Sequence, residues 1–242
     1  MFRTYRLTQW LYGGLDWLFP PVCAGCERTG SRWCADCQQQ VKLVPEPVCQ
    51  SCGRPLSHPG LCPTCNDSRP AYDAMRSWAS FEGPIRHALH SLKYYRNVAL
   101  GDVLARHLVT YVRRLGWQVD MVVPVPLGRQ RMQERGYNQA GLLAMPVSVI
   151  QNWHYSSEAV TRIRETRSQV GLSGRERKEN ITSAFRADPA RVSGKVILLM
   201  DDVTTTGATM AACADALRKA GAKTVYGLTL ARALPHHGLQ NI

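Results

Sequence analysis

The stretch from Val196 to Met210 restricts the fold of this 242-residue chain more than any other part of it. The apolar run that ends at Met200 is typical of a strand buried on both faces, as in the middle of a parallel sheet. Asp201 and Asp202 follow it, and after a threonine-rich turn an apolar pattern begins at helical spacing. The stretch therefore predicts a strand, a turn and a helix of an α/β domain.

The turn in this stretch has the composition of a phosphate-binding loop. Threonine hydroxyls and free N–H groups at a helix N-terminus donate to phosphate oxygens, and Gly207 permits close approach of the backbone. Neither Gly-x-x-x-x-Gly-Lys nor Gly-x-Gly-x-x-Gly is present, which excludes two common nucleotide-binding signatures. Adjacent carboxylates before such a turn suit a phosphorylated sugar, because they accept hydrogen bonds from ribose hydroxyls. An ordinary loop with a threonine helix cap is the alternative.

The sequence of this turn resembles the phosphoribosyl pyrophosphate (PRPP) motif of type I phosphoribosyltransferases. The resemblance implies that the two carboxylates bind the ribose 2- and 3-hydroxyls, that the threonine loop binds the 5-phosphate, and that Mg²⁺ accompanies PRPP. It identifies no catalytic residue, and it leaves open whether the chain turns over a substrate. The predicted PRPP-binding residues are Asp201, Asp202, Val203, Thr204, Thr205, Thr206, Gly207, Ala208 and Thr209.

Further strand and helix patterns surround this unit. Strand patterns at 119–125, 159–164 and 224–230 are separated by helical patterns or loops, which predicts a mainly parallel sheet flanked by helices. Residues 72–81 alternate weakly, as in a strand or a hairpin. The predicted fold class is therefore α/β and phosphoribosyltransferase-like. Helices are predicted at 84–95, 98–115, 138–152 and from the threonine loop to Ala220.

Two basic segments are candidates for a second anion site. An arginine cluster follows the 119–125 strand, and the segment 165–180 is polar and basic. In phosphoribosyltransferases the corresponding regions grip pyrophosphate and close over it, and the planar guanidinium of arginine binds two phosphate oxygens at once. A solvated basic surface without such a function is the alternative. The predicted pyrophosphate-binding residues are Arg129, Arg131, Arg135, Arg164 and Arg177.

Eight of the nine cysteines form four Cys-x-x-Cys pairs. Each pair can present two thiolates to one metal ion from a tight turn, and two pairs complete a tetrahedral structural zinc site. The spacing favours two sequential sites, with interleaved pairing as the alternative. Few apolar side chains lie between the ligands, so zinc would supply the folding energy of this region. The predicted ligands are Cys23, Cys26, Cys34, Cys37, Cys49, Cys52, Cys62 and Cys65.

Charge and cysteine usage restrict the partners and the compartment. We predict two domains, 1–70 with an amphipathic helix at 7–19 and the double zinc ribbon, and 71–242 with the phosphoribosyltransferase-like fold. The formal net charge of +12 favours anionic partners, and the excess of basic residues lies in the second domain. Metal-binding cysteines indicate a reducing compartment. Since we recognise no signal peptide and no membrane span, we predict a cytoplasmic protein.

Taken together, the motifs resemble those of the ComF/GntX family of bacterial proteins. Besides the PRPP motif, the resemblance rests on Pro124-Val-Pro-Leu with Arg135-Gly-Tyr-Asn-Gln139, and on Arg164-x-Thr166-x-x-Gln169 with Arg177-x-x-Asn180. It implies a role in DNA uptake during competence or in the use of extracellular DNA.

Three kinds of function compete at this stage. The first is pentosyl transfer from PRPP. The second is binding of single-stranded DNA by a protein that retains the PRPP-type site, with Tyr94, Tyr95 and Tyr137 stacking on bases near basic residues. The third is recruitment of DNA-uptake machinery proteins by the zinc ribbon. The segment from Lys93 to Arg96 can contact a base or phosphate, or it can be a solvated helix end.

Overall fold

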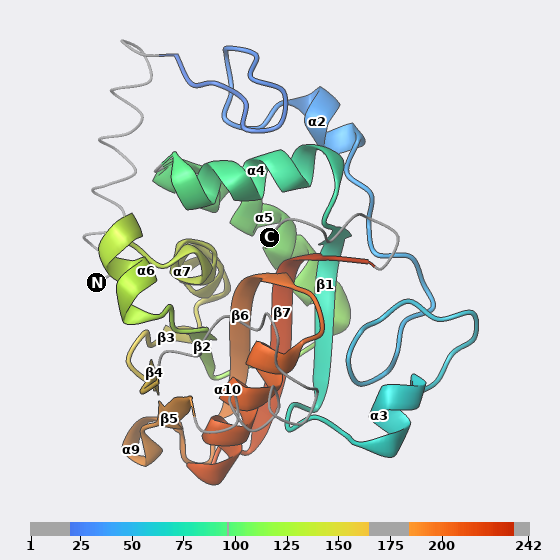
Figure 1. Ribbon diagram of the computed structural model, residues 1–242, viewed down its shortest axis with the longest axis vertical. Helices are drawn as coiled ribbons and strands as arrows, with labels where there is room; N and C mark the ends of the chain where they lie inside the picture. The colour runs from blue at the N-terminus through green and yellow to red at the C-terminus, as the bar shows by residue number, and fades with distance from the viewer. Residues whose placement is uncertain (1–19, 96, 165–183, 235–242) are drawn as a thin grey trace.

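The structure is a computed structural model that describes residues 20–95, 97–164 and 184–234. These residues form a five-stranded parallel sheet, in the order β1-β7-β6-β2-β3, with helices around it (Figure 1). The weakly alternating segment at 72–81 is confirmed as a strand, β1, at one edge of the sheet. The helix predicted at 7–19 and the polar segment at 165–180 lie outside the described residues. The strands are β1 (Ala74–Ser80), β2 (Met121–Pro124), β3 (His154–Tyr155), β6 (Val196–Thr204) and β7 (Thr224–Arg232).

Strand β6 lies at the centre of the sheet and is buried on both faces. Because successive side chains of a strand point to opposite faces, Ile197 and Leu199 pack in one core, and Leu198 and Met200 pack in the other. All four side chains are fully buried. This explains why the run is continuously apolar rather than alternating.

Helices cover the two faces of the sheet and the end at which its strands finish. Helices α5 and α7 pack on one face, α10 packs on the other, and α4 lies across the carboxyl end and packs on α5 (Figure 1). Within the described ranges, no helix combines the length and apolarity needed to cross a membrane. The bounds are α4 (Gly83–Tyr94), α5 (Val98–Leu115), α6 (Arg129–Arg135), α7 (Gln139–Gln151) and α10 (Ala208–Lys219).

The strand predicted at 159–164 does not join the parallel sheet, so that part of the prediction is wrong. Residues Val160–Arg162 form β4, which pairs antiparallel with β5 (Phe185–Ala187) in a separate two-stranded sheet. The short strand β3 instead takes the edge position beside β2. The small sheet, followed by helix α9 (Pro189–Val192), packs its apolar side against α10.

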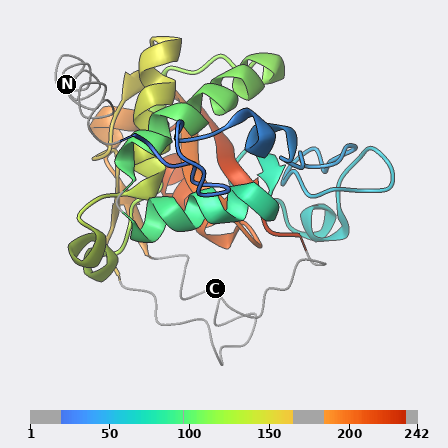
Figure 2. The same ribbon diagram turned by 90° about the horizontal axis from the view of Figure 1, so that it is seen from above.

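The cysteine-rich segment lies along the β1 side of the molecule. It contains two short helices, α2 (Ala35–Gln39) and α3 (Pro63–Asp67). Between them, residues 42–44 run beside the edge of the sheet: the Ser80 N–H donates to the Lys42 carbonyl at 2.8 Å. Seen from above, the first part of the segment lies near α4, and the second part extends to the side beyond β1 (Figure 2).

Candidate functional site

The predicted sugar-phosphate residues lie where the connections of the sheet change direction. Strands β2 and β6 are neighbours, but α7, which follows β2 after the short helix α6, covers one face, and α10, which follows β6, covers the other. In open α/β sheets, ligands bind in the crevice outside the carboxyl ends of strands at such a position. The fold therefore provides a crevice at the point where Asp201 and Asp202 occur.

The loop from Thr204 to Thr209 connects β6 to α10 and surrounds a small hollow. Gly207 has a φ of 82° and precedes the first residue of the 12-residue helix α10, a conformation that favours glycine. The Thr206 hydroxyl accepts a hydrogen bond from the Ala208 N–H at 3.4 Å. The hollow has a volume of about 60 Å³, and its lining includes Asp201 and every residue from Val203 to Met210. The loop thus places threonines and the N-terminus of a helix around one small space.

Backbone hydrogen bonds orient the two adjacent carboxylates. Asp201 accepts from the Asp202 N–H at 2.8 Å, and Asp202 accepts from the Val203 N–H at 2.8 Å. The second oxygen of Asp202, Oδ2, is buried, and among the described residues no group donates a well-directed hydrogen bond to it. The Lys93 Nζ lies 3.3 Å from this oxygen, which is an ion-pair distance with poor hydrogen-bond geometry. Each carboxylate therefore uses one oxygen for the backbone.

The two carboxylates lie in different environments. Asp201 lies in the lining of the hollow, whereas Asp202 pairs with Lys93 at the end of α4 and is absent from that lining. The sequence alone suggested that Lys93 contacts a base or phosphate or is solvated, and the ion pair with Asp202 was not predicted. No local sequence pattern predicts this ion pair, because its formation depends on how α4 lies across the end of the sheet.

Asp201 has an unfavourable environment for a charged group. Burial raises its pKa well above the usual range, and the neighbouring Asp202 carboxylate raises it further. The Asp202 N–H and the Lys93 ammonium act in the opposite direction, but they do not reverse the shift. A cationic ligand or a donor of hydrogen bonds at this point would stabilise the ionised form.

The predicted pyrophosphate-binding arginines within the described residues lie on α6 and just beyond β4. Arg129, Arg131 and Arg135 belong to the short helix α6, which ends before Gly136, a residue with a φ of 78°. The sequence predicted an arginine cluster here, but not a separate helix. Arg129 and Arg131 are exposed, and the Arg135 guanidinium lies 5.5 Å from the centre of the Tyr94 ring. Arg164 is exposed beyond β4. Arg177 lies outside the described residues.

The eight paired cysteines form two groups in sequential order. Cys23, Cys26, Cys34 and Cys37 form the first group, and Cys49, Cys52, Cys62 and Cys65 form the second, with the Sγ atoms of each group within 4.8 Å of one another. No disulfide joins the nine cysteines, all of which lie in the described ranges.

The sulfur positions fit zinc. Three Sγ–Sγ separations, in the pairs Cys23–Cys37, Cys26–Cys34 and Cys52–Cys62, are 3.6, 3.7 and 3.7 Å. A tetrahedral site with Zn–S bonds of about 2.3 Å places its sulfur atoms roughly 3.8 Å apart. The geometry therefore suits a metal held by four thiolates.

Backbone donors favour the thiolate form at one cysteine of each group. Burial opposes ionisation of Cys23, but the N–H groups of Cys34, Gly25 and Cys26 outweigh it and lower the pKa of Cys23 to about 6. Cys49 has the same arrangement: burial opposes ionisation, the Cys62 N–H donates at 3.3 Å, and the pKa is about 6. Preformed amide donors of this kind are suited to a metal-bound thiolate.

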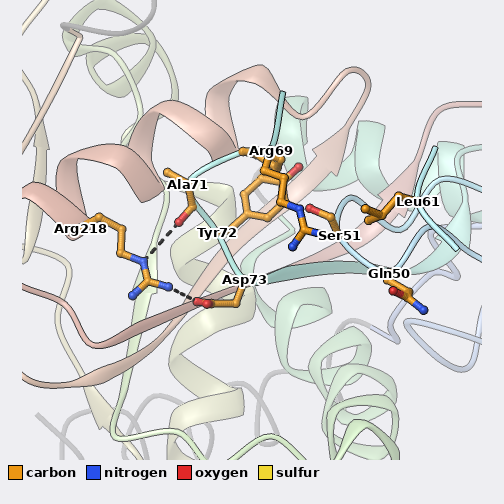
Figure 3. Close-up of a pocket in the computed structure, with 9 residues that line it drawn as sticks. Gln50, Ser51, Leu61, Arg69, Ala71, Tyr72, Asp73 and Arg218 are labelled. Carbon is orange, nitrogen blue, oxygen red and sulfur yellow. Dashed lines mark hydrogen bonds and ion pairs between the residues drawn. The ribbon is translucent and has the colours of Figure 1, made fainter. Parts of the chain in front are cut away.

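A larger cavity lies away from the crevice. It has a volume of about 380 Å³ and lies between the second cysteine group and α10, beside Ser51, Tyr72 and Arg218 (Figure 3). Its most prominent cation, Arg218, is already bound to the Asp73 carboxylate and to the Ala71 carbonyl. Because Arg218 is already paired within the protein, the smaller hollow remains the candidate position for the predicted sugar-phosphate residues.

Comparison with known families agrees with the geometry of both parts. The double zinc ribbon domain family matches residues 14–66, and the phosphoribosyl transferase domain family matches residues 91–236. The chain belongs to the phosphoribosyltransferase domain family. Its double zinc ribbon and two cysteine groups support structural zinc.

Relatives of this phosphoribosyltransferase-family chain share nearly its whole length. The DNA utilization protein YhgH of Shigella flexneri is 36% identical over 230 residues, which cover 91% of this chain and 98% of that protein. Competence protein F of Haemophilus influenzae is 31% identical over 208 residues, covering 83% and 90% respectively. Competence protein ComFC of Bacillus subtilis is 27% identical over 210 residues, covering 83% and 84%. The resemblance to the ComF/GntX family is thereby confirmed.

Two solved structures match part of this chain. A glutamine PRPP amidotransferase from B. subtilis is 20% identical over 58% of this chain and 26% of that chain, with a TM-score of 0.37. A hypoxanthine phosphoribosyltransferase from Staphylococcus aureus is 14% identical over 59% of this chain and 67% of that chain, with a TM-score of 0.33.

The two zinc sites are expected to lose metal at different rates. Cys26 in the first group is exposed, whereas all four cysteines of the second group are buried. A chelator should therefore remove one zinc equivalent quickly and the other slowly, as measured by a colorimetric zinc indicator. Cys26→Ser should abolish the fast phase. Loss of the fast phase in Cys62→Ser instead would contradict this assignment.

Neutralising Asp201 should stabilise the protein without ligand at neutral pH. Because the folded-state pKa of Asp201 lies above the unfolded one, this group destabilises the folded protein at neutral pH, and the penalty shrinks as the pH falls below the folded-state pKa and is gone below the unfolded one. Asp201→Asn should therefore raise Tm, by roughly 2–4 °C if the gain is about 1 kcal/mol. Scanning calorimetry should show the gain shrinking toward acidic pH. The exposed Asp67→Asn is the control, and an equal gain there would refute the burial argument.

Proposed function

We propose that this protein binds PRPP, or a closely related phosphorylated ribose, together with Mg²⁺ at the carboxyl end of β6. The observation that carries the proposal is the pair Asp201 and Asp202, each held by a backbone N–H, directly before a loop that ends in the N-terminus of α10. Such a loop supplies fixed donors for a phosphate, and the carboxylates supply acceptors for sugar hydroxyls.

Different residues would bind different groups of the ligand. The loop from Thr204 to Thr209 would hold the 5-phosphate, and Asp201 and Asp202 would accept from the ribose hydroxyls. The basic residues would hold the pyrophosphate, which is the leaving group in pentosyl transfer. Displacement of pyrophosphate proceeds through a cationic sugar, so positioning and stabilisation of the leaving group would supply the catalysis. These basic residues are Arg129, Arg131, Arg135, Arg164 and Arg177.

The biological setting follows from the relatives. The proteins that match most of this chain are named for DNA utilization and for competence. We therefore propose that the sugar-phosphate site serves the use or uptake of DNA. We also propose a cytoplasmic location, because cysteines gathered in two metal-binding groups are typical of a reducing compartment.

Isothermal titration with PRPP and Mg²⁺ tests this function. Wild type should release heat with one site per chain, and the double variant Asp201→Ala, Asp202→Ala should lose most of the affinity. Hydrogen bonds to a charged group contribute about 1.5–3 kcal/mol each, so a loss of more than tenfold is expected. The exposed Asp67→Ala should bind like wild type. Equal heats from wild type and the double variant would rule out the proposed site.

A second candidate function, binding of single-stranded DNA, rests on an aromatic surface beside the crevice. Tyr94 and Tyr95 are 61% and 72% exposed, and they directly follow Lys93 at the end of α4. The His90 ring lies against both, with centroid distances of 4.5 and 5.6 Å, and Arg135 lies over Tyr94. Exposed aromatic rings with adjacent cations suit the stacking of unpaired bases.

One tyrosine of the predicted DNA surface, Tyr137, has a hydrogen-bond partner within the protein. The Tyr137 hydroxyl donates to the Leu92 carbonyl at 2.6 Å and joins the end of α4 to the start of α7. Tyr137 is only partly exposed, so the aromatic surface consists of Tyr94 and Tyr95.

Fluorescence anisotropy with a labelled oligothymidylate tests the DNA surface. The double variant Tyr94→Ala, Tyr95→Ala should bind at least tenfold more weakly, since stacking contributes about 1–3 kcal/mol per base. The matched Tyr94→Phe, Tyr95→Phe variant keeps the rings and should bind like wild type. Wild-type affinity should also fall with salt, because basic residues contact phosphates. Salt-independent binding, or equal binding by the alanine variant, would exclude this surface.

A further inference from the structure

The two cysteine groups pack in different cores. Cys23 and Cys37 lie in the core that contains α4, α5 and α7, whereas the four cysteines of the second group lie in the core that contains α10. The first group meets the start of α4: a methyl group added at Gly25 would lie 2.6 Å from the Cys37 Sγ and 3.0 Å from the Pro84 Cβ. The second group is therefore the one that shares its packing with the phosphate loop.

The second group is fastened to the start of β1. The Met75 N–H donates to the Ser51 carbonyl at 2.7 Å, between Cys49 and Cys52. Gly53 has a φ of 67°, and a methyl group there would lie only 2.4 Å from the Met75 carbonyl oxygen. This close approach of two backbones leaves no room for a side chain, so the position of the turn at 49–53 and the position of Met75 depend on each other.

Two side chains extend from this contact to the phosphate loop. A methyl group added at Gly207 would lie 3.1 Å from the Met75 Cε and 3.4 Å from the Tyr72 hydroxyl oxygen. Met75 is fully buried and Tyr72 is 5% exposed, and both belong to the core of the second cysteine group. The left-handed turn at Gly207 therefore rests on two side chains that the second group holds in place.

A buried arginine makes a separate connection. Arg232 at the end of β7 is 2% exposed and donates from Nη2 to the Cys52 carbonyl. Its strand neighbour on β6 is Thr204, the first residue of the loop, and the next residue, Ala233, donates to the Thr204 carbonyl at 2.9 Å. Within the described part of the chain, the Arg232 Nε has no hydrogen-bond partner. The hydrogen bond to the Cys52 carbonyl is therefore an important interaction of this buried guanidinium.

We propose that metal at the second cysteine group braces the phosphate loop, so that its occupancy controls phosphate binding at the crevice, whereas metal at the first group does not. The turn at 49–53 has no core of its own, and metal binding is what holds such turns. When the second metal is lost, the Ser51 and Cys52 carbonyls lose their fixed positions, and Met75, Tyr72 and Arg232 no longer support Gly207 and Thr204. The part that concerns ligand affinity rests on the function proposed above; the part that concerns loop order does not.

Hydrogen exchange of the full chain, measured by mass spectrometry, tests the brace without a ligand. Cys62→Ser should lose one zinc equivalent and raise the exchange rate of amides at 203–212 by about tenfold, within the usual range of coupling between sites. Cys34→Ser is the matched control, since it should also lose one equivalent but leave 203–212 unchanged. Peptides from α5 report the global fold and should stay protected in both variants.

Arg232→Met tests the connection in a protein that keeps both metals. It should retain two zinc equivalents yet raise exchange at 203–212, and Arg232→Lys should restore part of the protection because it keeps a buried donor. If Cys62→Ser fails to fold, as loss of protection in α5 would reveal, Arg232→Met decides. Unchanged exchange at 203–212 in Arg232→Met would overturn the proposal.

Titration of the same variants with PRPP and Mg²⁺ separates the two hypotheses. Affinity should fall about tenfold in Cys62→Ser and Arg232→Met and stay unchanged in Cys34→Ser. Absence of binding by wild type would refute the proposed function while leaving the exchange result to decide the brace. Binding by wild type with equal affinity in Cys62→Ser would refute control by the second metal.

Discussion

The burial of β6 on both faces is the constraint from which the other features follow. Both faces of this strand need cover, and α7 and α10 supply it from opposite sides. The crevice lies at the carboxyl end of this strand, where the connections to the two faces separate. Asp201 and Asp202 occupy that end, where the strand emerges from its two cores. Their position therefore follows from the packing of apolar residues that precede them by only a few positions.

The position of these two carboxylates is electrostatically unfavourable. Two adjacent carboxylates at the end of a buried strand repel each other, and burial raises the pKa of Asp201. Lys93 and two backbone N–H groups compensate in part. The raised pKa of Asp201 means that this position lowers the stability of the folded protein at neutral pH.

Sequence patterns predicted much of the fold because each relevant signal was local. The apolar run of β6, the loop that follows it and the paired cysteines are continuous in the chain, and spacing alone indicated two metal groups. The placement of 160–162 failed for the opposite reason: a three-residue strand carries too little pattern to reveal its partner. The contacts of Lys93 and Arg232 were not predicted, because their partners, Asp202 and Cys52, are more than a hundred residues away in sequence.

The pairing of residues 42–44 with β1 connects the cysteine-rich segment to the edge of the parallel sheet. This short segment between the two cysteine groups covers the outer hydrogen-bonding groups of an edge strand. An uncovered edge is a template on which a second chain can add a strand. Removal of the cysteine-rich segment would therefore expose these backbone groups of β1, and an exposed edge of this kind favours pairing with a second chain.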